Sequence, residues 1–134
     1  MDAPRQQDLW TLALEHYQAA VLTAQQGWHN VSVACSYYAV FMAMRTALGE
    51  PPRRYWEHGG IVDWFARGDW QTPPASIERE LIRAIRRMYT DRVRAQYGTV
   101  RLQPFESAAR LSTAHRVLQT VANALGLSEG GITP

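Results

Sequence analysis

Apolar residues recur at helical spacing along the whole chain, and five glycines interrupt that pattern. Between the interruptions an apolar side chain returns every three or four residues, which is the period of an α-helix. Glycine readily adopts the left-handed backbone conformation that closes a helix, so each of the five is expected to end one. They are Gly27, Gly49, Gly68, Gly98 and Gly126. We therefore predict an all-α protein.

The first two long helices are expected over residues 5–26 and 30–48. Asn30 can serve as the N-cap of the second, because its side-chain oxygen can accept a hydrogen bond from a free backbone N–H. Apolar residues surround this second helix on nearly every side, so it should be the most buried element. Serines and Arg45 interrupt its apolar run, which favours a central bundle helix over a membrane span.

Two further long helices are expected in the second half of the chain. One begins after residues 72–76, with Thr72 or Ser76 as its cap. Its buried face should comprise Ile77, Leu81, Ile85, Met88, Tyr89 and Val93. The other follows Pro104 and carries an apolar seam at heptad spacing, which is typical of helices that pack at a shallow angle. The seam is formed by Ala108, Leu111, His115, Leu118, Ala122 and Leu125.

The connection between residues 49 and 75 is too long to be a structureless loop in a compact domain. It contains Trp56, Trp64 and Trp70, and residues 61–66 suit a short helix. We therefore expect a four-helix up-down bundle with an additional short helix in a tryptophan-packed crossover. Residues 1–126 should form this single domain, followed by a flexible C-terminal tail over 127–134.

The composition narrows the functional classes. The chain has no lysine, so all 14 of its positive side chains are arginine, the better bidentate ligand for phosphate. A net charge of +2 is too small to indicate nucleic-acid binding by itself. One cysteine, Cys35, permits no internal disulfide, and the N-terminus resembles no secretion signal, so a cytoplasmic protein is expected. The four histidines show no paired ligand spacing, so we expect neither a metal nor a cofactor.

Four motifs follow one another in a fixed order along the chain. They are Ser36-Tyr37-Tyr38-Ala39-Val40-Phe41, Arg45, His58-Gly59-Gly60 and Arg92-Val93-Arg94-Ala95-Gln96-Tyr97-Gly98. This order resembles the HEPN superfamily, in particular its small stand-alone proteins with a Tyr-Tyr-Ala-x-Phe motif in the second helix. The resemblance covers nearly the whole chain. It implies a helical bundle that forms a homodimer and pairs with a minimal nucleotidyltransferase, often in a toxin–antitoxin or defence system.

The resemblance also directs attention to the end of the third long helix. Many HEPN proteins are metal-independent ribonucleases with an Arg-x(4–6)-His motif there, and the branch that this chain resembles usually has Arg-x-x-Ala-Asp-Tyr. In this chain Gln96 replaces the acid, and no histidine lies four to six residues after Arg92. Arg92 can stabilise a charged phosphorane, but Tyr97, with an ordinary pKa near 10, is a poor base. The ribonuclease motif is therefore degenerate, and whether the protein is an enzyme stays open.

A literal Arg-x4-His segment also occurs in the last helix, from Arg110 to His115. Five helical residues turn the chain through about 500°, so these two side chains diverge by roughly 140°. His115 also belongs to the apolar seam. We therefore interpret it as a core or interface histidine.

The candidate site is expected where Arg45, His58 and Arg92 meet around a phosphate. The catalytic candidates are Arg92, His58 and Tyr97, with His58 the first choice for proton transfer. The candidates for binding RNA or a nucleotide are Arg45, His58, Arg87, Arg92, Arg94, Tyr97 and Tyr37. Of these, Arg87 belongs to a row along one side of the third long helix, and Arg94 lies further along that helix; the row is Arg79, Arg83, Arg86 and Arg87.

Each candidate also has a structural interpretation. Arg45 suits the C-terminal turn of its helix, where a cation is stabilised by the exposed carbonyls. His58 can pin the crossover through a backbone hydrogen bond, and a row of arginines usually forms a solvated face. Tyr38 is expected in the core, whereas Tyr37 can face either a site or a dimer partner.

The leading hypothesis is a dimeric HEPN-type module that binds RNA or a nucleotide and pairs with a nucleotidyltransferase-like protein. Two alternatives stay open. The first is a metal-independent ribonuclease that uses Arg92 with His58 or Tyr97. The second is a purely structural dimeric adaptor.

Overall fold

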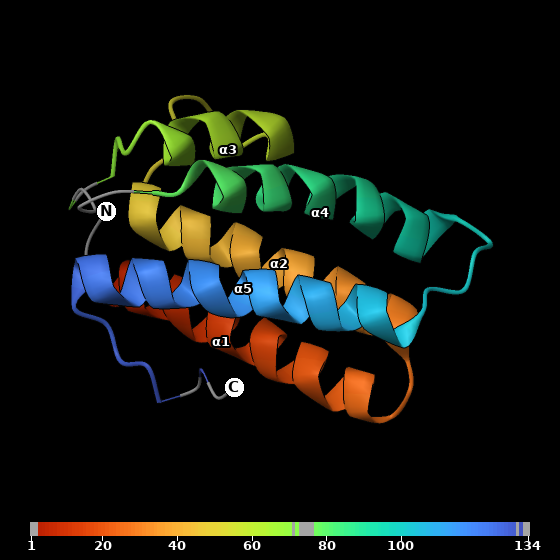
Figure 1. Cartoon of the computed structure of the whole chain (residues 1–134). Coiled ribbons are helices and arrows are strands. Elements are labelled where there is room, and N and C mark those ends of the chain that lie inside the picture. The colour runs from red at the N-terminus through yellow and green to blue at the C-terminus, as the bar shows by residue number, and fades with distance from the viewer. Residues whose placement is uncertain (1–2, 71, 73–76, 131, 133–134) are drawn as a thin grey trace.

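The structure is a computed structural model that describes residues 3–70, 72, 77–130 and 132. Its helices are α1 (Ala3–Gln25), α2 (His29–Leu48), α3 (His58–Ala66), α4 (Arg79–Tyr97) and α5 (Pro104–Leu125), and the described residues contain no strand. The four long helices lie side by side with alternating direction, and α3 packs beside α4 at one edge of the bundle (Figure 1). The expected up-down bundle with a short crossover helix is confirmed.

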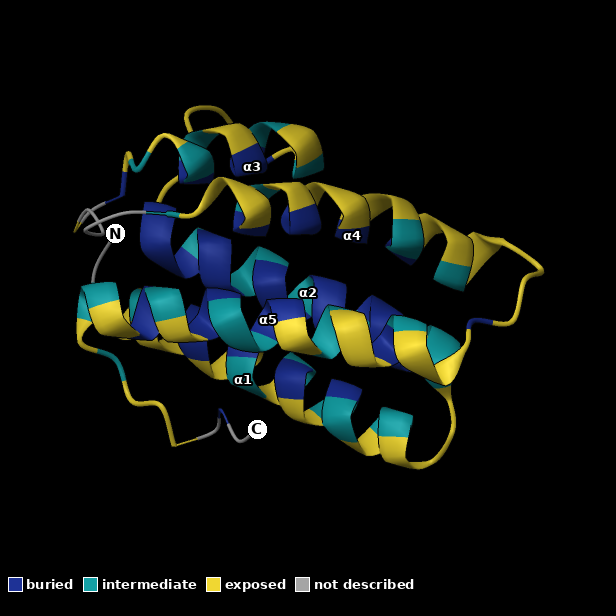
Figure 2. Ribbon diagram, viewed as in Figure 1, coloured by how far each residue is buried: buried dark blue, intermediate teal, exposed yellow. Residues whose placement is uncertain are grey.

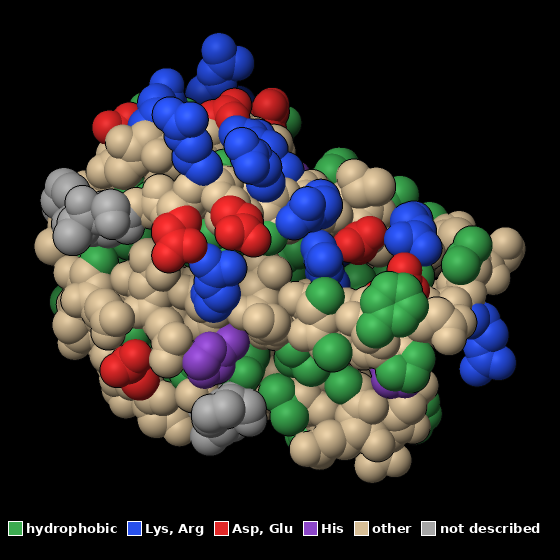
Figure 3. All heavy atoms as spheres, viewed as in Figure 1, with side chains coloured by type: hydrophobic (Ala, Val, Ile, Leu, Met, Phe, Trp, Pro, Cys, Tyr) green, Lys and Arg blue, Asp and Glu red, His purple; other side chains and the backbone are tan. Residues whose placement is uncertain are grey.

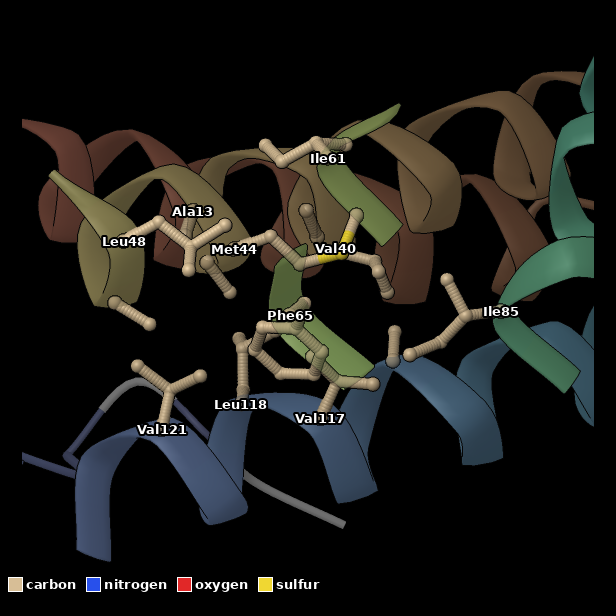
Figure 4. Packing of buried hydrophobic residues seen from close by; sticks show 14 of the residues in the cluster. Ala13, Val40, Met44, Leu48, Ile61, Phe65, Ile85, Val117, Leu118 and Val121 are labelled. Carbon is tan, nitrogen blue, oxygen red and sulfur yellow. The ribbon is translucent and has the colours of Figure 1, made fainter. Parts of the chain in front are cut away.

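Helix α2 is the centre of the bundle, because it contacts each of the other four helices. It is long and apolar enough to cross a membrane, but most of it is buried inside the protein (Figure 2). Its apolar surface is therefore explained by packing, as expected for a core helix. Met44 of α2, Phe65 of α3 and Leu118 of α5 are among the fully buried side chains of this core (Figure 4). Burial of each such side chain stabilises the fold by about 1.5–3 kcal/mol.

Four of the five glycines adopt a positive φ, as expected, but Gly98 has a φ of −84°. The expectation of a left-handed conformation is wrong there, although α4 does end at this position. A β-carbon on Gly98 would lie 2.7 Å from the Arg94 carbonyl oxygen, so a side chain is excluded by close backbone approach instead.

Asn30 does not cap α2, because the helix begins one residue earlier, at His29. The Asn30 side chain donates to the carbonyls of Ala95 (3.3 Å) and Val100 (3.0 Å) and accepts from the Leu102 backbone N–H (2.8 Å). Asn30 therefore fixes the connection between α4 and α5 to the start of α2. A capping residue and a tethering residue both need a short polar side chain, so sequence alone did not separate these roles.

Helix α4 begins at Arg79 without a side-chain cap. Thr72 is therefore not its cap, and Ser76 lies outside the described residues. Glu78 occupies the N-cap position, and its carboxylate forms an ion pair with Arg116 of α5 at 2.7 Å. The helix is thus anchored at its start by a contact with α5.

The buried faces of α4 and α5 are rotated about the helix axis from the faces that the sequence predicted. On α4, Leu81, Ile85 and Met88 are buried as predicted, but Tyr89 and Val93 are exposed and Arg92 is buried instead. On α5, the central buried row is Ala114, Val117, Leu118, Val121 and Ala122. The predicted seam residues Ala108, Leu111, His115 and Leu125 lie at its edge or outside it. The apolar stripe of α5 is wide, and the residues at heptad spacing lie along one edge of this stripe rather than at its centre.

The crossover is packed by its tryptophans as predicted. Trp56 and Trp70 are buried, and Trp70 stacks on Phe65 with 4.5 Å between ring centroids. The described part of the C-terminal tail also contacts the bundle. Trp10 Nε1 donates to the Ser128 carbonyl at 3.0 Å, and Ile132 is buried. The tail is therefore not free of the domain at these two positions.

Candidate functional site

The candidate site forms where α2, the first residue of α3 and the last two turns of α4 come together. Tyr37 of α2 is only 2% exposed, and its hydroxyl forms a hydrogen bond with Nδ1 of His58. His58 is the first residue of α3, and its imidazole stacks on the Phe41 ring at 4.5 Å between centroids. The imidazole is thus held between two residues that lie one turn apart on α2.

Arg92 of α4 also packs against the Tyr37 ring. Four tyrosine rings surround its guanidinium, and we call this arrangement the Arg92 cage. The guanidinium carbon lies 5.3 Å from the ring centroids of Tyr37 and Tyr89 and 6.0 Å from those of Tyr38 and Tyr97. All four distances lie within the range of a cation–π interaction, about 6 Å. The cage therefore stabilises a positive charge at the surface of the core.

Arg92 has little else to balance that charge. It is 9% exposed, and its Nη1 donates to Gln96 Oε1 at 3.0 Å. Its Nε is buried and has no hydrogen-bond partner, and no carboxylate among the described residues lies within ion-pair distance. Burying an uncompensated charge costs several kcal/mol, so an anion that bound at the cage would stabilise it.

The two groups next to Arg92 are held in their neutral forms. Burial, and then the positive charge of Arg92, lower the pKa of His58 below its usual value of 6.5. Burial raises the pKa of Tyr37 above its usual 10, although Arg92 opposes that shift. The imidazole and the phenol are therefore both uncharged at neutral pH. Either can donate the hydrogen bond between them, which sets whether His58 Nε2 is a proton donor or an acceptor.

Of the three residues expected to meet, the structure brings His58 and Arg92 together but not Arg45. Tyr37, Phe41 and Arg45 are spaced by four residues along one side of α2. Eight helical residues separate Tyr37 from Arg45, which corresponds to about 12 Å along the helix axis. Arg45 instead lines a neighbouring hollow, which it shares with Phe41. The expectation of one pocket for all three residues is therefore wrong for Arg45.

Arg87 and Arg94 lie on the other side of α4 from the cage. Their positions are rotated by about 140° and 200° from that of Arg92 on an ideal helix. Arg94 forms ion pairs with Asp91 (3.3 Å) and Glu106 (3.4 Å), whereas Arg87 is exposed. Figure 3 shows arginine side chains spread over the outer face of the bundle near α3 and α4. These two predicted residues therefore do not belong to the Arg92 site.

Tyr97 does belong to the cage, and the residue is 74% exposed. Tyr37 does contact the site, as one of its two expected roles, but the burial of the two tyrosines of α2 differs from the expectation. Tyr37 is the core residue, whereas Tyr38 is half-buried and its hydroxyl donates to Gln96 Oε1 at 3.5 Å. Tyr37 continues the buried row of Val33, Val40 and Met44, which faces the centre of the bundle more directly.

Sequence reasoning missed four residues of the site: Tyr38, Phe41, Tyr89 and Gln96. Tyr89 precedes Arg92 by three residues and Gln96 follows it by four, so Tyr89, Arg92 and Gln96 share one side of α4. That spacing was the available signal, but Tyr89 was assigned to the core as an apolar residue. Among the described residues, no three His, Cys, Asp or Glu side chains come together as a metal site would require.

The electrostatics of the site yield a test by NMR. His58 should titrate below 6.5, and Arg92→Gln should raise its pKa part of the way back, because burial continues to disfavour the imidazolium. The same substitution at exposed Arg83, nine residues away on α4, should leave the pKa unchanged. Since the unfolded chain takes up this proton first, stability should fall as pH drops from 6.5 toward the folded pKa. A His58 pKa at or above 6.5 would contradict this electrostatic description.

Comparison with known proteins places the chain in a family. A sequence model of the HEPN domain matches residues 6–128, which include nearly all of the five helices. The UPF0332 protein glr0978 of Gloeobacter violaceus is 35% identical over 85 residues, which cover 62% of this chain and 68% of that protein. Together with the helical bundle and the ordered tyrosine, histidine and arginine motifs, these matches show that the chain belongs to the HEPN domain family.

Proposed function

We propose that this HEPN-domain protein binds RNA or a nucleotide through a phosphate group at the Arg92 cage. The observation that carries the proposal is a buried guanidinium with an unpartnered Nε and no carboxylate in contact among the described residues. A guanidinium presents several N–H donors in a planar fork that fits two phosphate oxygens. A phosphate beside the guanidinium would therefore supply the missing negative charge.

The rings of the cage suit the rest of a nucleotide. Tyr97 is 74% exposed and Tyr89 is 44% exposed, so both present ring surface to solvent beside the guanidinium. Stacking of a base on an aromatic side chain contributes about 1–3 kcal/mol and requires no particular base. The combination favours a ligand with a phosphate next to an aromatic base, rather than an isolated anion.

A purely structural role explains the cage less well. An arginine that only joins helices is usually better stabilised by a carboxylate, as Arg116 is by Glu78 at 2.7 Å. Burial of an arginine without a counter-ion destabilises a fold, and an apolar residue of similar size would avoid that penalty. The adaptor hypothesis would therefore be preferred only if the protein did not bind RNA.

Binding is tested with a fluorescently labelled single-stranded 12-nucleotide RNA and the purified full-length chain. Arg92→Gln should weaken binding by about 10- to 150-fold, because a charge-assisted hydrogen bond contributes about 1.5–3 kcal/mol. Arg83→Gln removes an equal charge from exposed α4 surface and should change the affinity less than about threefold. Fluorescence anisotropy measures both, and circular dichroism checks that each variant is folded. Equal affinities for the wild type and the Arg92 variant would refute the proposal.

A metal-independent ribonuclease is the second candidate function, because a neutral imidazole lies next to the caged arginine. When His58 Nδ1–H donates to the Tyr37 oxygen, Nε2 has a free lone pair and can accept the 2′-hydroxyl proton of RNA. Attack of the 2′-oxygen on phosphorus would then break the bond to the 5′-oxygen, which takes the proton back. Arg92 would stabilise the charged phosphorane. The products would be a 2′,3′-cyclic phosphate and a 5′-hydroxyl.

The ribonuclease hypothesis predicts cleavage of labelled RNA in EDTA that is lost in both His58→Gln and Arg92→Gln. His115→Gln provides the matched control, since His115 packs near Tyr17 on another side of the bundle, and light scattering checks that this variant keeps the oligomeric state of the wild type. Gel electrophoresis with detection of cyclic phosphate ends identifies the product. Unchanged RNA, or cleavage that survives in the His58 variant, would leave binding as the function of the cage.

A homodimer and pairing with a nucleotidyltransferase-like protein, in a cytoplasmic toxin–antitoxin or defence system, complete the proposal. Membership of the HEPN family supports both partnerships. A mainly apolar hollow between α1 and α5 also supports a second copy of the chain. It has a volume of about 550 Å³ and is lined by Tyr17, Val21, Ala24, Leu111 and His115.

A further inference from the structure

The side of α2 that carries Tyr37 and Phe41 leads into a hollow rich in arginine. This hollow has a volume of about 320 Å³ and lies beneath the connection between α2 and α3. Its lining includes Phe41, Arg45, Arg53, Arg54 and Tyr55, and we call it the arginine hollow. None of its arginines is required to explain the Arg92 cage.

The arginine hollow has an excess of positive charge. In addition to Arg45, Arg53 and Arg54, the hollow is lined by Arg5 and Glu50. These two residues form an ion pair with each other at 3.1 Å. Within the described part of the chain, Arg45, Arg53 and Arg54 have no carboxylate at ion-pair distance. Arg45 is half-buried, and its Nη1 donates a hydrogen bond to the sulfur of Met42 at 3.6 Å. An anion is therefore the ligand that this lining favours.

Phe41 connects the hollow with the Arg92 cage. One side of its ring is stacked on His58 at 4.5 Å, and the same residue lines the hollow next to Arg45. Phe41 and Arg45 lie one turn apart on the same side of α2 and are both half-buried, and the buried Tyr37 lies one turn before Phe41. The cage and the hollow are thus linked through Phe41, with about 12 Å of helix between Tyr37 and Arg45.

The connection that carries Arg53 and Arg54 is anchored rather than free. Trp56 is buried, its Nε1 donates to the Gly49 carbonyl at 3.1 Å, and its ring packs edge-on against Trp64 at 5.8 Å. Tyr55, immediately before this anchor, is 68% exposed and presents its ring at the rim of the hollow. The hollow therefore offers both elements that a nucleotide strand uses, positive charge and an aromatic stacking surface.

We propose that the arginine hollow is a second phosphate subsite and that the ligand is a single-stranded RNA segment that spans the cage and the hollow. This inference rests on the proposed function, because it requires one phosphate at Arg92. A stacked strand advances about 3.4 Å per nucleotide, so a span of about 12 Å, the helix rise from Tyr37 to Arg45, corresponds to about three or four nucleotides. A mononucleotide or dinucleotide is too short to occupy both subsites.

The inference is tested by the length dependence of RNA affinity, with single-stranded oligonucleotides of two, four, eight and twelve nucleotides and the full-length protein. For the wild type, affinity should rise by about tenfold or more between two and eight nucleotides as the second subsite is filled. The double variant Arg53→Gln/Arg54→Gln should lose most of this gain while it still binds the dinucleotide. The slope of log affinity against log salt for the 12-nucleotide RNA should fall by about 1.4, or 0.7 for each lost contact.

The double variant Arg79→Gln/Arg83→Gln is the matched control, because it removes the same charge from the exposed start of α4. It should retain the full length dependence. Binding that depends on Arg92 but does not increase with length overturns this inference and leaves the proposed function intact. Equal losses in the two double variants overturn it as well, since they would indicate a general charge effect. If none of the RNAs binds, the proposed function fails together with it.

Discussion

The structure around the candidate site depends on a positive charge that is buried without a counter-ion. Arg92 lies among four tyrosine rings, and the described residues supply one neutral acceptor, Gln96, for its guanidinium. Each cation–π contact contributes about 0.5–2 kcal/mol, so the cage offsets part of the cost of burial. The charge also acts on His58, which it helps to keep neutral. One residue thus links the packing of α2 and α4 to the chemistry at the start of α3.

The architecture could be predicted from the sequence because its signals are local. Glycine stops, helical spacing and the tryptophans of the crossover each act over a few residues, and they identified every helix. Apart from the caps at Asn30 and Thr72 and the conformation of Gly98, the errors were rotations about helix axes. Tyr37 and Tyr38 differ by 100° on α2, and which of them faces the core depends on where α4 and α3 lie. A single sequence carries little information about such tertiary choices when the apolar stripe is wide, as it is on α2 and α5.

The site was predicted only in part for the same reason. The family resemblance directed attention to His58 and Arg92, and these residues are brought together. The resemblance gave no distance along α2. Arg45 was therefore placed in the same pocket, although it lies about two helical turns from Tyr37. Arg87 and Arg94 were candidates because of their charge, but the helical rotation takes them away from Arg92. Tyr89 and Gln96 acquire their roles only through contact with the guanidinium, which no local pattern indicates.

The central claim is that Arg92 lacks an anion, and the substitution Gln96→Glu tests it most directly by supplying one. Gln96 Oε1 already accepts a hydrogen bond from Arg92 Nη1 at 3.0 Å, so a carboxylate fits this position with almost no change in shape. The free energy of unfolding should rise by about 1 kcal/mol in urea denaturation, and RNA affinity should fall because the carboxylate competes with phosphate. The control Gln18→Glu adds the same charge on exposed α1 and should do neither. A Gln96→Glu variant that is no more stable than the wild type and binds RNA equally well would contradict the account.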